Sequence, residues 1–122
     1  MPNRGVVIVE DQPDIREFLG WVLKGRWEVI GEAASVTEAL QIIPELKEIQ
    51  PPPIVILDGS FPHSGDGDIV AAVLRSEIPG IRILGYSAAN QTYGDINLHK
   101  PAEIAEILKA VQTLADQALA EA

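Results

Sequence analysis

Two short runs of consecutive apolar residues limit the folds open to this chain more than any other feature. Residues 6–9 read VVIV and residues 54–57 read IVIL, and such β-branched runs are typical of strands buried on both faces of a parallel sheet. Three further strands are predicted, at residues 27–30, 81–86 and 96–98. Helical periodicity follows the first, second, third and fifth strands. This alternation predicts an α/β fold with a doubly wound parallel sheet.

The length and charge of the chain disfavour several classes of protein. Residues 1–122 are expected to form a single domain. The 18 acidic and 9 basic side chains give a net charge of −9, which disfavours direct binding to nucleic acid or to an anionic membrane. There is no cysteine, so neither a disulfide nor a thiolate metal site is expected. Because no apolar run is long enough to span a membrane, we expect a soluble, cytoplasmic protein.

Carboxylates follow both of the all-apolar strands. Glu10 and Asp11 come directly after the first, and Asp58 comes directly after residues 54–57. The carboxyl ends of parallel strands meet at one edge of the sheet, where open α/β folds bind their ligands. Three carboxylates at one edge need a positive partner to stay ionised, and hard oxygen ligands of this kind suit Mg²⁺. For Asp58 taken alone, a turn-forming role fits the sequence as well as a chemical one.

Two further polar residues would reach the same edge. Ser87 follows the fourth predicted strand and Lys100 the fifth, with Pro101 expected at the first position of a final helix. The combination of an acid pair after the first strand, D-x-x-x-P from Asp58, S-A from Ser87 and K-P from Lys100 resembles the receiver domain of two-component response regulators. The resemblance extends from residue 5 to about residue 119, which is nearly the whole chain.

The resemblance implies a fold and a metal site. The fold would be CheY-like, a five-stranded parallel sheet in the order 2-1-3-4-5. The metal would be Mg²⁺, held by Glu10, Asp11 and Asp58 with the backbone carbonyl of Ser60 as a further ligand. No other cofactor is implied.

The resemblance also implies roles in phosphoryl transfer. Asp58 would be the phospho-acceptor that attacks the phosphohistidine of a sensor histidine kinase or phosphotransfer protein. Lys100 would pair with the acyl phosphate, and the hydroxyl of Ser87 would hydrogen-bond to it. A divalent cation, an ammonium group and a hydroxyl together neutralise the oxygens of a phosphoryl group in transfer. Such a module takes part in its own phosphorylation without being a turnover enzyme.

Two features depart from the usual receiver pattern. Asn97 stands three residues before Lys100, where many receivers have an aromatic residue that turns inward on phosphorylation. Only residues 88–95 connect the fourth and fifth strands, which is too few for a crossover that carries a helix. We expect this helix to be a turn or absent, leaving the face of these two strands open to a homodimer or another protein. Alternatively, Tyr93 folds over the sheet and the protein is a monomer with an ordinary surface.

We therefore expect a stand-alone response regulator that has no effector domain and signals through protein–protein contacts. The alternative is a pseudo-receiver, a binding module with the same fold that is not phosphorylated. A metal-dependent phosphatase or small hydrolase on the same sheet is disfavoured. Such an enzyme needs an acid two residues beyond Asp58 as a proton donor, and Ser60 occupies that place.

Overall fold

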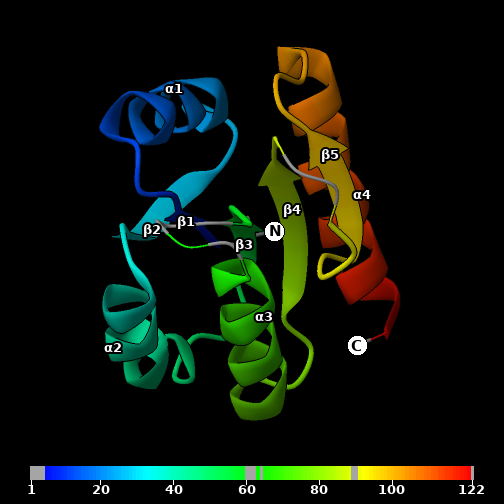
Figure 1. Cartoon of the computed structure of the whole chain (residues 1–122). Helices are drawn as coiled ribbons and strands as arrows, with labels where there is room; N and C mark the ends of the chain where they lie inside the picture. Colours follow the sequence, from blue (N-terminus) through cyan, green and yellow to red (C-terminus); the bar gives the residue numbers. More distant parts are fainter. Residues whose placement is uncertain (1–4, 60–62, 64, 89–90, 122) are drawn as a thin grey trace.

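The computed structural model describes residues 5–59, 63, 65–88 and 91–121 (Figure 1). Within these residues the chain forms five strands and four helices. In chain order the elements are β1 (Gly5–Val9), α1 (Pro13–Leu23), β2 (Glu28–Ala33), α2 (Val36–Leu46), β3 (Ile54–Leu57), α3 (Asp66–Glu77), β4 (Arg82–Ser87), β5 (Ile96–His99) and α4 (Ile104–Glu121).

All five strands are parallel and form one sheet in the order β2-β1-β3-β4-β5. The two all-apolar runs, β1 and β3, lie next to each other inside the sheet, and each is covered on both faces. This position explains why neither strand has polar residues on one face, as an edge strand commonly does. The predicted doubly wound α/β fold and its strand order are confirmed.

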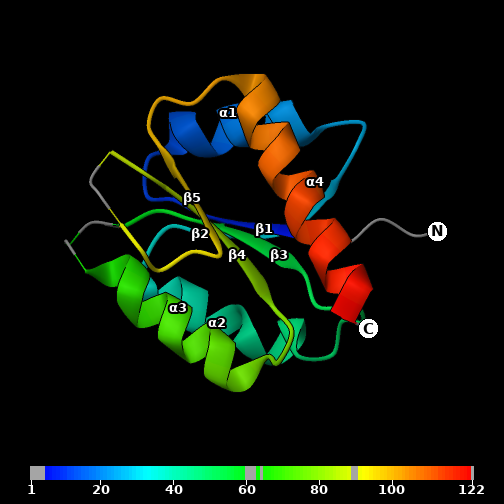
Figure 2. The same ribbon diagram turned by 90° about the vertical axis from the view of Figure 1, so that its right-hand side faces the viewer.

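The helices cover the sheet in two layers. Figure 2 shows α1 and α4 on one side of the sheet and α2 and α3 on the other. Successive side chains of a strand leave opposite faces, so β1 and β3 contribute to both layers. Val7 and Leu57 pack in the core under α2 and α3, whereas Ile8 and Ile56 pack in the core under α1 and α4.

The connection between β4 and β5 contains no helix in its described residues, 88 and 91–95. The prediction that no full helix fits here is confirmed for that part of the chain. The backbone N–H of Asp95 donates to the carbonyl of Ile83, and the N–H of Ile83 donates back to the Asp95 carboxylate, both at 2.7 Å. Two residues before Asp95, the carbonyl of Tyr93 accepts a hydrogen bond from the guanidinium of Arg75 in α3 at 2.6 Å.

On the side of the sheet that α2 and α3 cover, the expectation of an uncovered apolar strip on β4 and β5 is wrong for the described residues. Tyr93 folds over the sheet and is only 7% exposed, within the core under α2 and α3. On the same face of β5, the exposed positions are polar, Asn97 and His99. The alternative in which Tyr93 covers the sheet is therefore the one observed, and a homodimer through this face lacks the apolar surface on which its prediction rested.

The last helix begins later than Pro101, where it was predicted to begin. Its first residue is Ile104, because the carbonyl of Glu103 accepts the N–H of Ile107 at 3.1 Å and so forms the first turn. The side chain of Glu106 reaches back to the N–H of Glu103 at 3.3 Å. This bond satisfies a backbone donor at the start of the helix.

No helix in the described part of the chain combines the length and the apolar character needed to cross a membrane.

Candidate functional site

Three carboxylates lie together at the carboxyl edge of the sheet. Glu10 and Asp11 follow β1, and Asp58 follows the neighbouring strand β3. Their ligand atoms all lie within 4.8 Å of one another. Glu10 and Asp58 are buried and Asp11 is partly exposed. Backbone bonds extend the sheet to this point, because the N–H of Asp58 donates to the carbonyl of Val9 at 3.0 Å.

Lys100 brings a positive charge into this cluster. Its Nζ lies 2.9 Å from Oε1 of Glu10 and 3.5 Å from Oδ1 of Asp58. Its backbone N–H donates to the carbonyl of Ser87 at 2.9 Å, which fixes the end of β5 against β4. The ring of Tyr86 lies below the ammonium group, 5.5 Å from Nζ to its centroid. The two carboxylates and the Tyr86 ring hold the ammonium group beside the buried acids, whose negative charge it compensates.

Ser87 reaches the same place from the end of β4. Its side chain is buried, and its Oγ lies 2.9 Å from the point that a Cβ on Gly59 would occupy. The N–H of Gly59 in turn donates to Oδ1 of Asp58 at 2.7 Å. The hydroxyl of Ser87 therefore lies beside the residue that follows Asp58.

Of the six residues predicted from the sequence for this site, five lie together at one edge of the sheet. These are Glu10, Asp11, Asp58, Ser87 and Lys100. The sixth, Ser60, lies outside the described residues.

The surroundings of Glu10 make its carboxyl group hard to ionise. The pKa of Glu10 is raised from 4.5 to about 8, first by burial and then by the hydrogen bond and the charge of Asp58, whereas Lys100 acts in the opposite direction. Near neutral pH, Glu10 therefore keeps its proton. A bound divalent cation would replace that proton, because a metal ligand has to be deprotonated.

Arg16 belongs to the surroundings of the site and was not predicted from the sequence. Its Nη1 donates to the backbone carbonyl of Glu10 at 2.7 Å, and its Nε lies 3.9 Å from a carboxylate oxygen of Glu32. Arg16 is the fourth residue of α1, where a cation opposes the helix dipole. A positive residue so close to the start of a helix was the signal that it binds an acceptor nearby.

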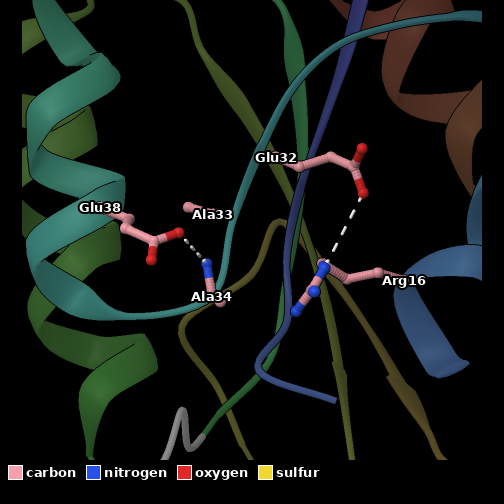
Figure 3. A pocket seen from close by; sticks show the side chains of 5 residues that line it. All are labelled: Arg16, Glu32, Ala33, Ala34 and Glu38. Carbon is pink, nitrogen blue, oxygen red and sulfur yellow. Dashed lines mark hydrogen bonds and ion pairs between the residues drawn. The ribbon is translucent and has the colours of Figure 1, made fainter. Parts of the chain in front are cut away.

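An open pocket of ≈ 290 Å³ lies between Arg16 and the residues at the end of β2 and the start of α2 (Figure 3). Figure 3 shows the guanidinium of Arg16 turned toward Glu32, and the carboxylate of Glu38 turned toward the backbone nitrogen of Ala34. Both acids thus already have partners within the protein. The pocket is lined by Arg16, Glu32, Ala33, Ala34 and Glu38. None of the three clustered carboxylates lines it.

When the chain is compared with models of known protein families, one model matches most of its length. The model for the response regulator receiver domain matches residues 6–112. A search of the curated proteins finds no match.

Several solved structures have the same fold. A CheY-like receiver domain protein from Methanospirillum hungatei superposes with a TM-score of 0.84 at 18% identity, covering 99% of this chain and 100% of that one. The receiver domain of a modulated diguanylate cyclase from Desulfovibrio desulfuricans, described as an example of alternate folding, gives 0.83 at 21% identity, with coverage of 99% and 100%. A CheX–CheY complex with BeF3 and Mg²⁺ from Borrelia burgdorferi gives 0.78 at 21% identity, with coverage of 91% and 88%. At these identities the likeness concerns the fold.

Proposed function

Because this chain belongs to the response regulator receiver domain family, we propose that it receives a phosphoryl group on Asp58 from a phosphohistidine kinase or phosphotransfer protein. The signal then passes on through protein–protein contacts. The observation that carries this proposal is the surroundings of Asp58: a buried carboxylate with an ammonium 3.5 Å away and two further acids within reach of one cation.

The chemistry requires only an ionised carboxylate and a way to neutralise the phosphoryl oxygens. An oxygen of Asp58 attacks the phosphorus, a P–O bond forms, and the P–N bond of phosphohistidine breaks. The leaving imidazole takes the electron pair of that bond. Lys100 balances the negative charge of the phosphoryl group, and the hydroxyl of Ser87 donates to one of its oxygens. Placement and charge neutralisation are the main requirements of such a transfer.

The donor set fits Mg²⁺. Glu10, Asp11 and Asp58 offer hard carboxylate oxygens, and their summed charge exceeds that of the single ammonium of Lys100. We propose that these three residues, with the backbone carbonyl of Ser60, hold the cation. When bound, it supplies positive charge to the phosphoryl oxygens. The Mg²⁺ and BeF3 of the Borrelia complex support this proposal.

The pseudo-receiver remains the second candidate, because of Asn97. Its Oδ1 accepts from the N–H of Gly94 at 3.0 Å, and its Nδ2 donates to the carbonyl of Gly94 at 3.1 Å. The side chain is engaged in the loop and is exposed. A binding module that keeps the fold without using phosphorylation would tolerate this arrangement.

The deciding experiment is phosphorylation by a small phosphodonor, acetyl phosphate, in the presence of Mg²⁺. Intact mass spectrometry should detect one added phosphoryl group, and hydroxylamine should remove it, as expected for an acyl phosphate. Asp58→Asn should take up none. Asp116→Asn, which changes an acid on α4 that accepts a hydrogen bond from Gln112, should behave as the unchanged protein. If the unchanged protein binds Mg²⁺ but takes up no phosphoryl group, the pseudo-receiver is the correct alternative.

A further inference from the structure

The ring of Tyr93 lies in a slot formed by glycines. A Cβ on Gly67 would lie 2.9 Å from the ring, and one on Gly85 would lie 3.3 Å from it. The first distance is shorter than real carbon atoms adopt, and the second is tight. The hydroxyl end reaches Gly59, where a Cβ would lie 3.5 Å from the phenol oxygen. The ring fits because neither β4 nor the start of α3 has a side chain at these points.

The hydroxyl of Tyr93 holds the backbone on which Asp58 depends. It donates to the carbonyl of Leu57, the residue before Asp58, at 2.6 Å. Its oxygen and the Oγ of Ser87 both lie next to the position that a Cβ on Gly59, the residue after Asp58, would occupy. Tyr93 is therefore bonded to the residue before Asp58 and lies beside the residue after it. Burial first, and then the nearby carboxylates, raise the pKa of Tyr93 above its ordinary value, so the hydroxyl stays a donor.

The backbone of the same loop is fastened at its other end. Arg75 holds the carbonyl of Tyr93 at 2.6 Å and lies 3.3 Å from the carboxylate of Asp95. Asp95 forms two backbone-directed bonds with Ile83 in β4. The described segment 91–95 is thus a strap, with Tyr93 attached beside Asp58 and Asp95 attached to the sheet.

We propose that Tyr93 is a positioning residue for Asp58 and that it couples the occupancy of the Asp58 site to the closure of the strap at residues 91–95. The proposal rests on the proposed function and adds to it. In this role Tyr93 does not itself bind the phosphoryl group or the cation, and it acts through the backbone at Leu57 and Gly59. Coupling between two sites is reciprocal. If a closed strap improves the placement of Asp58, an occupied site stabilises the closed strap.

Three variants test the positioning role. Tyr93→Phe removes the bond to Leu57 and keeps the ring, and Tyr93→Leu removes the ring as well. Leu46→Ala is the matched control, because it truncates a buried residue of the same core at the far end of α2. With acetyl phosphate and saturating Mg²⁺, the rate constant of phosphorylation should fall about tenfold or more in Tyr93→Leu and less in Tyr93→Phe, since small misplacement of reacting groups is costly. Leu46→Ala should stay within about twofold at temperatures where it is folded.

A second readout follows the strap itself. Amide hydrogen exchange at Asp95 reports whether its bond to Ile83 is closed. Beryllium fluoride with Mg²⁺, a phosphoryl mimic, should slow this exchange about fivefold or more in the unchanged protein and in Leu46→Ala, a coupling of ordinary size. It should not slow the exchange in Tyr93→Leu. Loss of a merely structural contact would change the exchange rate with and without the mimic by the same factor.

The outcomes separate the two proposals. The role of Tyr93 is overturned, and the proposed function left intact, by either of two results. One is a rate constant of phosphorylation in Tyr93→Leu equal to that of the unchanged protein, and the other is amide exchange at Asp95 of the unchanged protein that beryllium fluoride does not slow. If Tyr93→Leu does not fold, Tyr93→Phe decides by the same two measurements. If the unchanged protein takes up no phosphoryl group, the proposed function fails. Weaker Mg²⁺ binding in Tyr93→Leu than in Leu46→Ala then supports the positioning role, and equal binding, or none in the unchanged protein, overturns it.

Discussion

The stabilisation of the protein by Mg²⁺ should depend steeply on pH. Only the folded chain brings Glu10, Asp11 and Asp58 together, so a cation bound by all three stabilises the native state. Glu10 has a pKa of about 8 in the folded protein, and a carboxylate that binds a metal has to give up its proton. When the pH is lowered from 8 to 6, protons therefore compete with Mg²⁺ for the carboxylate of Glu10.

The expected size follows from these values. A site with few protein ligands and several waters would bind Mg²⁺ with a dissociation constant of about 1 mM at pH 8. With a pKa of about 8, Glu10 is about half ionised at pH 8 and about 1% ionised at pH 6, so the affinity falls roughly 50-fold. At about 10 mM Mg²⁺ the stabilisation is then about 1.4 kcal/mol at pH 8 and about 0.1 kcal/mol at pH 6. For a chain of 122 residues, this corresponds to a rise in Tm of about 5 °C at pH 8 and less than about 1 °C at pH 6.

Thermal unfolding followed by circular dichroism, at both pH values and at constant ionic strength, measures these shifts. Glu10→Gln should lose most of the Mg²⁺ shift at pH 8, because it removes a ligand. Glu28→Gln is the matched control, since this exposed acid lies at the opposite end of the sheet, at the start of β2. Equal Mg²⁺ shifts at pH 6 and pH 8, or an undiminished shift in Glu10→Gln, would refute the reasoning.

Three further outcomes follow from the same cluster. Without Mg²⁺, the folded-state pKa of Glu10 lies above its ordinary value of 4.5, so protonated Glu10 stabilises the native state fully below pH 4.5, and this stabilisation is lost as the pH rises through about 8. The Tm of the unchanged protein should therefore fall over this range relative to that of Glu10→Gln, and parallel plots of Tm against pH for the two proteins would contradict this. Asp58→Asn should raise the free energy of unfolding of the metal-free protein by about 1 kcal/mol at pH 8, because it relieves repulsion; a clear loss in denaturant unfolding would count against it. Lys100→Met should lower the free energy of unfolding by about 3 kcal/mol at pH 8, since it leaves the buried carboxylates without the ammonium group, and by less at pH 6, where Glu10 holds a proton. A loss of stability that is the same at both pH values would contradict this.

The sheet and the edge that carries the site could be predicted because burial on both faces leaves a simple pattern. The apolar runs of β1 and β3 determine where Glu10 and Asp58 emerge, and parallel pairing brings them together. The extent of β2 was less predictable. The strand continues to Ala33 through Gly31 and Glu32, residues of weak strand propensity, because pairing with β1 outweighs local preference.

Other parts of the site depend on contacts that leave no periodic pattern. Arg16 binds a backbone carbonyl, and every residue has one, so the sequence does not indicate the acceptor. The inward position of Tyr93 depends on open space above Gly67 and Gly85, which only the folded chain creates. Sequence reasoning therefore left two alternatives open for Tyr93, and the structure decides between them.

The two bonds between Asp95 and Ile83 have a consequence for inserting new sequence into this protein. A one-residue slip of β5 would exchange the faces on which its side chains lie. Because Asp95 is fixed to Ile83 just before the strand begins, residues added on the Ser87 side of Gln91 would lengthen the loop without moving the strand. Added length there costs little loop-closure free energy. The connection is therefore a suitable point at which to graft a peptide tag or a reporter domain, provided that Tyr93 and Asp95 are kept.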